Sequence, residues 1–192
     1  MSKIVLVTGG ARSGKSSFAE SLCIKQNNRT AYIATSVAFD DEMKSRVKKH
    51  QQSRPKEWKT YEIYKDIYSI IEELGENHDT VIMDCVTLMV NNLMFTSGID
   101  IDVATSGELD ELESYIKNQI KKLLEAVKNT NLYFVIVTNE IGMGVVPENK
   151  LARIYGDFVG RANQQISKMS DEVYFVVSGI PMKVKWYKWK DL

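Results

Sequence analysis

The amino-acid sequence predicts an α/β fold, in which a doubly wound, mostly parallel sheet carries helices on both faces. Short apolar runs of strand length alternate along the chain with longer segments that repeat apolar residues at helical spacing. Several of these runs end in a polar residue or a glycine, at the edge of such a sheet where ligands bind. The 192 residues suit one domain, and no repeat, linker or low-complexity segment divides them.

The first strand is predicted over residues 3–8 and the first helix over residues 16–25. The run between them, from Gly9 to Ser16, fills every fixed position of the motif G-x-x-x-x-G-K-[ST]. Glycines let the backbone bend so that successive N–H groups point inward, and the helix N-terminus adds positive potential toward an anion. The sequence therefore predicts a nucleoside triphosphate site formed by Gly9, Gly10, Ala11, Arg12, Ser13, Gly14, Lys15 and Ser16.

Two side chains of this loop have predicted chemical roles. Lys15 reaches the β- and γ-phosphates, and the Ser16 hydroxyl ligates Mg²⁺. The predicted fold is thus P-loop NTPase-like, and residues 1–192 form a single P-loop nucleotide-binding domain.

The remaining elements follow from apolar periodicity and from turn residues. They are, in order, a strand over 30–35, a helix over 40–53 ended by Arg54-Pro55, an extended segment over 58–62, a helix from 67 that stops at Gly75, a strand over 80–84, helices over 88–95 and 109–128, a strand over 132–138, a helix over 148–169 and a strand over 173–177. The fold signal fades over residues 96–107, which we interpret as a variable insertion. Residues 186–192 form an aromatic and basic tail, either a packed terminal strand or a contact surface.

Polar residues follow four of the predicted strands directly. Because the carboxyl ends of parallel strands meet at one edge of a sheet, we expect these residues to line one crevice. The four groups are Thr8-Gly9, Thr35-Ser36, Asp84 and Thr138-Asn139-Glu140.

Composition limits the classes of partner. Lys and Arg number 25 and Asp and Glu number 25, so no overall field draws the protein to nucleic acid or to an anionic membrane. No apolar stretch approaches the length of a membrane span, and the first residues enter a strand without a signal-peptide pattern, so we expect a cytoplasmic protein. Cys23 and Cys85 lie in apolar segments without metal-ligand spacing and are expected to be core thiols.

Three titratable residues outside the glycine loop draw attention. Asp84 ends an apolar strand, the position of the metal-organising carboxylate in P-loop nucleotidases. His50 lies one helical turn after Arg46 among basic residues, where a phosphate would find cationic partners, although an exposed helix histidine fits the same pattern. A neutral imidazole can attack phosphorus. His78 lies in a polar turn and is expected on the solvated surface.

Motifs are spread along most of the chain. They comprise residues 8–16, 32–36 and 41–43, Arg46 and His50, Arg54-Pro55 with Trp58 and Glu62, residues 84–88 with Asn91-Asn92, residues 138–147, and Arg153, Gly160-Arg161, Asn163-Gln164 and residues 177–180. Taken together in this order, they resemble the bifunctional adenosylcobinamide kinase / adenosylcobinamide-phosphate guanylyltransferase family. The likeness runs from residue 4 to about residue 185 and leaves out residues 96–107 and 186–192.

The resemblance assigns roles that the residues alone leave open. It implies that His50 becomes covalently guanylylated, and that adenosylcobinamide and its phosphate are the substrates. It implies homotrimers, and it places GTP against the glycine loop and against Ala34, Thr35, Ser36, Gln51, Gln52, Ser53, Arg54, Glu62 and Asp84. Carboxylates suit guanine, whose N1–H and amine are adjacent donors, so guanine recognition and Mg²⁺ binding compete as roles for Asp84. The phosphoryl donor of the kinase step is either ATP or GTP.

Two other functions remain open at this point. One is a simple small-molecule or nucleotide kinase in which His50 has no role. The other is a nucleotide-dependent switch or nucleic-acid motor, although the balanced charge argues against a motor and Asn139-Glu140-Ile141-Gly142 is not the guanine-reading motif N-K-x-D.

Overall fold

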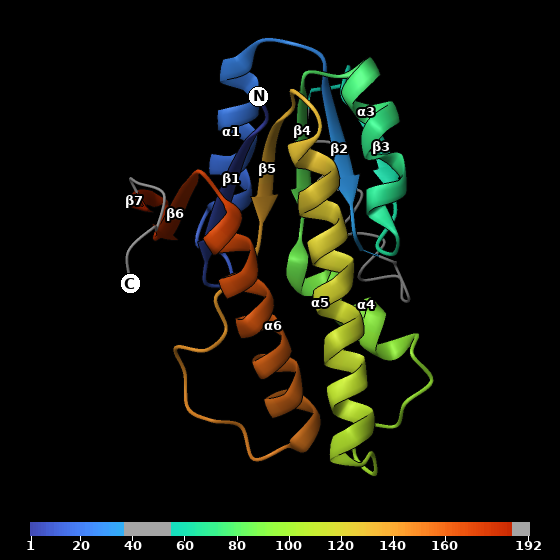
Figure 1. Ribbon diagram of the computed structural model, residues 1–192. Helices are drawn as coiled ribbons and strands as arrows, with labels where there is room; N and C mark the ends of the chain where they lie inside the picture. Colours follow the sequence, from blue (N-terminus) through green and yellow to red (C-terminus); the bar gives the residue numbers. More distant parts are fainter. Residues whose placement is uncertain (37–54, 186–192) are drawn as a thin grey trace.

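The computed structural model describes residues 1–36 and 55–185 (Figure 1). Within these residues, seven strands form one sheet in the order β3-β2-β4-β5-β1-β6-β7. The strands are β1 (Lys3–Gly9), β2 (Thr30–Ala34), β3 (Lys59–Glu62), β4 (Thr80–Asp84), β5 (Tyr133–Val137), β6 (Glu172–Val177) and β7 (Ile180–Lys185). The helices are α1 (Lys15–Gln26), α3 (Ile71–Asn77), α4 (Val86–Phe95), α5 (Ser106–Lys128) and α6 (Lys150–Met169), with a 3₁₀ helix η1 (Ile67–Ile70).

The strand pairing confirms the predicted mostly parallel sheet. All neighbouring pairs from β3 to β6 are parallel, and β7 alone runs antiparallel, to β6, at the edge of the sheet. Parallel strands need a crossover between them, which the helices supply. The carboxyl ends of β2, β4 and β5 therefore point toward the same edge, at the bottom of Figure 1.

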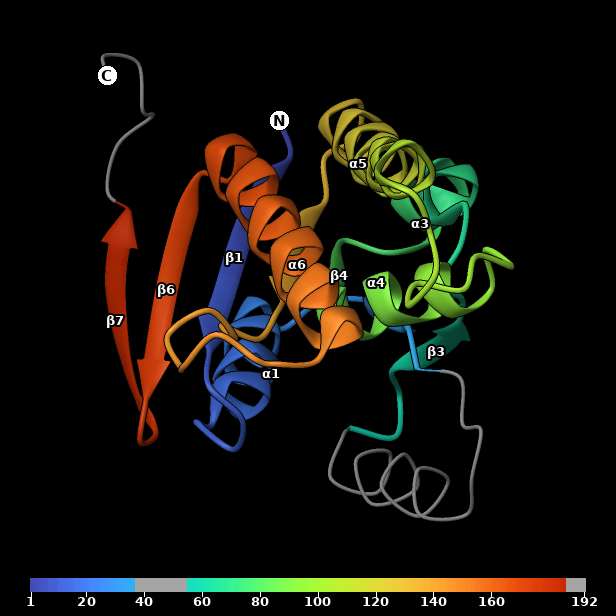
Figure 2. The same ribbon diagram turned by 90° about the horizontal axis from the view of Figure 1, so that it is seen from below.

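Helices cover both faces of the sheet, as predicted. Alternate residues of a strand face opposite sides, so Ile4 and Leu6 of β1 join one apolar cluster while Val5 and Val7 join the other. The first cluster includes residues of α3, α4, α5 and α6, and the second includes Ala19 of α1. Figure 2 shows α1 on one side of the sheet and α5 and α6 on the other.

The bounds of the helices differ from the predicted ones by one to four residues, and the differences at α3, α4 and α5 have a physical reason or a consequence. α4 begins at Val86, and α5 begins at Ser106 because Thr105 forms a capping box with Glu108. The last residues of the interpreted insertion thus belong to a helix, and Ile101 within it is buried in the core at 6% exposure. Gly75 lies inside α3 and does not end it, so the predicted stop is wrong.

The reason for Gly75 is packing. A Cβ on Gly75 would lie 3.1 Å from the Thr130 Cγ2 atom, so the glycine allows α3 to approach the turn before β5. The expectation that His78 is solvated surface is also wrong. His78 is half-buried, its ring meets that of Tyr61 edge-on at 6.0 Å between centroids, and burial lowers its pKa.

The edge strand β7 was not predicted from the sequence. Its sequence contains Pro181, which argues against a strand except at an edge, and β7 is an edge strand. β6 and β7 are joined by Ser178 and Gly179, whose φ angles of 49° and 83° are those of a tight hairpin turn. The tail over residues 186–192 lies outside the described residues.

Both cysteines are free and buried, which confirms them as core thiols. Burial raises the pKa of the Cys23 thiol to about 12. Among the described residues, none of the helices has the length and apolar character that crossing a bilayer requires.

Candidate nucleotide site

The predicted phosphate loop connects the carboxyl end of β1 to the N-terminus of α1. Arg12 and Gly14 have left-handed φ angles of 57° and 90°, and the Ser13 N–H donates to the Gly10 carbonyl at 3.2 Å. A Cβ on Gly9 would lie 2.5 Å from the Val176 carbonyl oxygen, so only glycine fits there. These backbone conditions produce the tight turn that the motif requires.

Polar groups of this loop lie ready for an anion. The Lys15 side chain is 9% exposed, and its Nζ atom donates to the Gly10 carbonyl at 3.2 Å, which holds the ammonium over the loop. The hydroxyl oxygens of Ser13 and Thr8 are buried and have no hydrogen-bond partner within the described residues. Buried hydroxyls normally have a partner, so their orphaned state fits a loop that binds a polar ligand.

The ends of the neighbouring strands meet this loop. Asp84 ends β4, is partly exposed, and lies in register with Ala34 of β2 and Val137 of β5. The Glu140 N–H, just after β5, donates to the Gly9 carbonyl at 3.0 Å. The predicted convergence of strand ends is therefore confirmed for β1, β2, β4 and β5.

Thr35 fixes the backbone directly after Asp84. The Thr35 side chain is fully buried, and its hydroxyl donates to the Cys85 carbonyl at 2.7 Å and accepts from the Cys85 N–H at 2.8 Å. The Asn92 side-chain amide donates to the Thr35 carbonyl at 2.7 Å, which ties α4 to the same point. The Thr35 hydroxyl is thus occupied within the protein.

Further hydrogen bonds extend this arrangement to β5 and α6. The Thr87 hydroxyl lies 2.9 Å from the Cys85 Sγ atom and accepts from the Asn139 side-chain amide at 2.7 Å. The Asn163 amide donates to the Asn139 carbonyl at 3.1 Å, and the Thr138 hydroxyl donates to the Asn163 side-chain oxygen at 2.7 Å. These hydrogen bonds therefore form a continuous polar network that joins the ends of β2, β4 and β5 to α4 and α6.

The thiol within this network is not a nucleophile at neutral pH. Burial, with a smaller contribution from Asp84, raises the pKa of Cys85 to about 11, although Lys15 acts in the opposite direction. A neutral thiol attacks poorly, because the thiolate is the reactive form.

Ser16, at the start of α1, and Asp84, at the end of β4, are the two residues predicted to ligate Mg²⁺. Within residues 1–36 and 55–185, no group of three or more His, Cys, Asp or Glu residues has a metal-binding arrangement. Mg²⁺ keeps several waters and is typically held by one or two protein oxygens plus substrate phosphates, so this sparse donor set fits Mg²⁺ beside a phosphate loop.

A family model described as cobinamide kinase / cobinamide phosphate guanyltransferase matches residues 5–184. The chain belongs to this family. It is 43% identical over 182 residues to a bifunctional adenosylcobalamin biosynthesis protein, CobU, of Escherichia coli, which covers 95% of this chain and 99% of that protein. The CobU of Salmonella typhimurium is 42% identical over the same shares. The bifunctional adenosylcobalamin biosynthesis protein CobP of Pseudomonas aeruginosa is 34% identical over 180 residues, which cover 94% of this chain and 96% of that protein.

The structure describes some of the predicted nucleotide contacts of this cobinamide kinase / guanyltransferase family member, and the others lie outside the described residues. Glu62 ends β3 with an exposed side chain, in register with Ala34, and Ser36 is half-buried at the end of the described part of that segment. The remaining predicted contacts lie outside the described residues; they are His50, Gln51, Gln52, Ser53 and Arg54.

Two features of the site were not assigned from sequence. The polar network beneath the strand ends was missed, although its members are the polar residues that follow apolar strands and begin helices. The contact of the β6–β7 turn with the phosphate loop was missed because β7 was not predicted. The pair Ser178-Gly179 is the turn signal that marks it.

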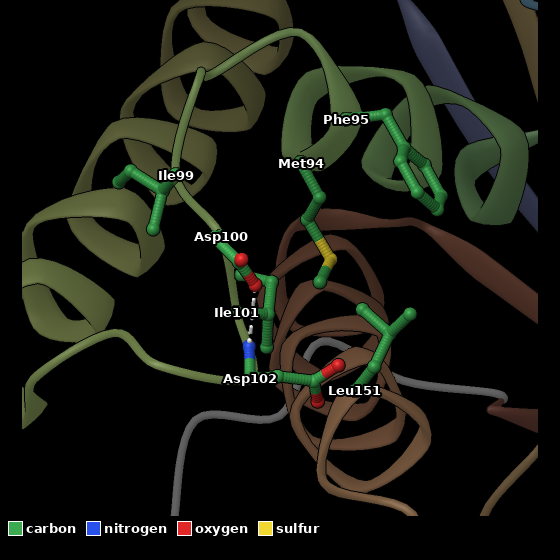
Figure 3. A pocket seen from close by; sticks show the side chains of 7 residues that line it. All are labelled: Met94, Phe95, Ile99, Asp100, Ile101, Asp102 and Leu151. Carbon is green, nitrogen blue, oxygen red and sulfur yellow. Dashed lines mark hydrogen bonds between the residues drawn. The ribbon is translucent and has the colours of Figure 1, made fainter.

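A separate cavity of about 310 Å³ lies between the end of α4 and the start of α6 (Figure 3). Its lining is mostly apolar and includes two aspartates, and none of the predicted nucleotide contacts lines it. Its lining residues are Met94, Phe95, Ile99, Asp100, Ile101, Asp102 and Leu151. This cavity is therefore separate from the predicted nucleotide site around the phosphate loop.

Proposed function

We propose that the protein catalyses two successive reactions on a corrinoid. It phosphorylates the hydroxyl of the aminopropanol arm of adenosylcobinamide, and it then transfers GMP from GTP to the new phosphate, giving adenosylcobinamide-GDP and pyrophosphate. The observation that carries this proposal is the complete phosphate loop from Gly9 to Ser16 in a chain that matches the family from residue 5 to residue 184.

In the kinase step, the phosphate loop holds the triphosphate of ATP or GTP. The Lys15 ammonium neutralises charge that develops on the transferred γ-phosphoryl group, and backbone N–H groups at the start of α1 hold the other phosphate oxygens. Mg²⁺, held by Ser16 and Asp84, supplies further neutralisation of the phosphate charge when bound. The acceptor hydroxyl forms the new P–O bond as the nucleoside diphosphate leaves.

In the guanylyl-transfer step, His50 acts as the nucleophile. An imidazole nitrogen attacks the α-phosphorus of GTP, and the bond from that phosphorus to the bridging oxygen breaks as pyrophosphate leaves. A phosphate oxygen of adenosylcobinamide phosphate then attacks the same phosphorus, which breaks the P–N bond and frees His50. The two steps bring different phosphorus atoms to the acceptor, so the nucleotide or the segment carrying His50 changes position between them.

The two carboxylates at the sheet edge divide two tasks. Asp84 ends β4, the strand-end position of the metal-organising carboxylate in phosphate-loop enzymes, so it serves the phosphates and Mg²⁺. Glu62 ends the outer strand β3 with an exposed carboxylate, so it accepts from the N1–H and amine of guanine. Ala34, Ser36 and the backbone of Thr35 line the nucleotide between them, together with Gln51, Gln52, Ser53 and Arg54.

We further propose a cytoplasmic homotrimer. Large apolar side chains are exposed on the loop after β5, among them Met143 at 77%, Val145 at 95% and Val146 at 74%. Clustered exposed apolar side chains mark contact surfaces. Sedimentation analysis of the purified protein is expected to give about three times the chain mass of 21.9 kDa, and a monomer at micromolar concentration would contradict the assembly.

Covalent labelling tests the proposed function. The protein is incubated with α-labelled GTP and Mg²⁺, and the label is expected to be acid-labile, alkali-stable and located on His50 by peptide mass spectrometry. The chain has two histidines, so His78→Asn is the matched control and retains the label, whereas His50→Ala loses it. Active kinase that takes up no label would leave the simple kinase as the function.

A further inference from the structure

Three glycines bring the β6–β7 hairpin against the phosphate loop. A Cβ on Gly9 would lie 2.5 Å from the Val176 carbonyl oxygen of β6, and a Cβ on Gly14 would lie 3.2 Å from the Gly179 Cα atom. The Gly179 N–H donates to the Ser13 carbonyl at 2.8 Å. The β6–β7 hairpin thus contacts both ends of the loop, through Val176 of β6 at Gly9 and through Gly179 of the turn at Ser13 and Gly14.

This hydrogen bond sets the direction of one loop amide. The Ser13 carbonyl and the Gly14 N–H belong to the same planar trans peptide unit, so they point in opposite directions. Because the carbonyl points toward Gly179, the Gly14 N–H points away from the hairpin, at the N-terminus of α1. That is the amide that such a loop presents to phosphate oxygens.

Gly179 is required for its conformation rather than for space. Its φ is 83°, a left-handed angle that a residue with a side chain adopts at a cost, yet nothing lies within 4 Å of the place its Cβ would take. A substitution there strains the turn without filling the loop. The amide of Gly179 is thus the part that acts on the phosphate loop.

We infer that Gly179 is a positioning residue for nucleotide binding, which holds the peptide between Ser13 and Gly14 so that the Gly14 amide faces the phosphates. This inference deepens the proposed function and rests on it only in that the loop binds a nucleoside triphosphate. The hairpin then acts on the affinity of the phosphate loop for the nucleotide.

The test compares Gly179→Ala with Gly98→Ala. Gly98 has a φ of 78° and nothing within 4 Å of its Cβ position, so the two changes impose the same strain, but Gly98 lies in the segment before α5. Both variants are expected to lose similar thermal stability. Calorimetric titration with a non-hydrolysable GTP analogue is expected to show binding weakened about fivefold or more in Gly179→Ala and within about twofold of the wild type in Gly98→Ala.

Equal affinity in Gly179→Ala and the wild type would overturn the inference, as would an equal loss in Gly98→Ala. Amide hydrogen exchange of the wild type provides a second measurement that needs no variant to fold. By linkage, saturation with the analogue is expected to slow exchange at Gly179 together with Gly14, and unchanged exchange at Gly179 contradicts the inference. Both measurements use the nucleotide analogue alone. Their results can therefore be interpreted even if the protein does not turn over a corrinoid or does not become labelled at His50.

Discussion

Replacing Thr35 by Val tests the polar network at the strand ends. Val keeps the shape of Thr but lacks the hydroxyl, so both hydrogen bonds to the Cys85 backbone disappear. The Cys85 carbonyl keeps the Met89 N–H, which donates to it at 3.1 Å, whereas the Cys85 N–H loses the partner that the hydroxyl provides. A buried donor left unsatisfied costs about 1–3 kcal/mol, so we expect the free energy of unfolding to fall by about 2 kcal/mol.

Thr80→Val is the matched control, measured with Thr35→Val by urea unfolding. Thr80, the first residue of β4, is also fully buried, but its hydroxyl has no hydrogen-bond partner within the described residues. Removing that hydroxyl is expected to leave stability unchanged or to raise it, because an unpaired buried polar group is unfavourable. A Thr35→Val protein within about 0.5 kcal/mol of the wild type, or an equal loss in Thr80→Val, would refute the reasoning.

Three further changes have defined outcomes. Gly9→Ala is expected to abolish GTP binding in calorimetry, because its Cβ would lie 2.5 Å from a carbonyl oxygen. Gly10→Ala is the control and is expected to retain GTP binding, because nothing lies within 4 Å of its Cβ position. Equal GTP binding by the two variants would contradict the loop geometry. Burial raises the pKa of Glu172, but hydrogen bonds from two lysines outweigh this and lower it from 4.5 to about 2. The stabilisation that the charged Glu172 provides is thus fully present above pH 4.5 and is lost as the pH falls toward 2. Glu172→Gln is therefore expected to reduce the change of Tm with pH between pH 4.5 and pH 2. An unchanged dependence of Tm on pH in this variant would argue against the ion pairs. Asp84→Asn is expected to raise the Mg²⁺ concentration needed for kinase activity by about tenfold or more. A variant that needs no more Mg²⁺ but discriminates less between GTP and ATP would instead assign Asp84 to guanine recognition.

The parts of the fold that the sequence predicts depend on local patterns. The buried strands are apolar runs, and the left-handed φ of Gly14 in the loop from Gly9 to Ser16 is a local backbone requirement that a motif records. The edge strand β7 was not predictable in the same way, because Pro181 and exposed alternation resemble a loop until β6 is seen beside it. Gly75 was misread for a related reason, since its contact with Thr130 is distant in sequence.

In the candidate site, too, local patterns predict some residues, whereas others depend on contacts between distant parts of the chain. The motif names Lys15 and Ser16, and the strand-end pattern names Asp84, because each has a fixed position relative to its own element. That the Thr35 hydroxyl serves Cys85 depends on how two strands pair, which no local pattern encodes. The hold of Gly179 on the phosphate loop likewise joins residues from opposite ends of the chain.

The central claim is that one phosphate loop serves both reactions and that His50 serves only the second. Mass spectrometry of the products formed from adenosylcobinamide, ATP, GTP and Mg²⁺ tests it most directly, with the wild type, His50→Ala and Lys15→Ala side by side. His50→Ala is expected to accumulate adenosylcobinamide phosphate, and Lys15→Ala to form neither product, even when supplied with that phosphate. Adenosylcobinamide-GDP from His50→Ala, or guanylyl transfer by Lys15→Ala at the wild-type rate, would contradict the account.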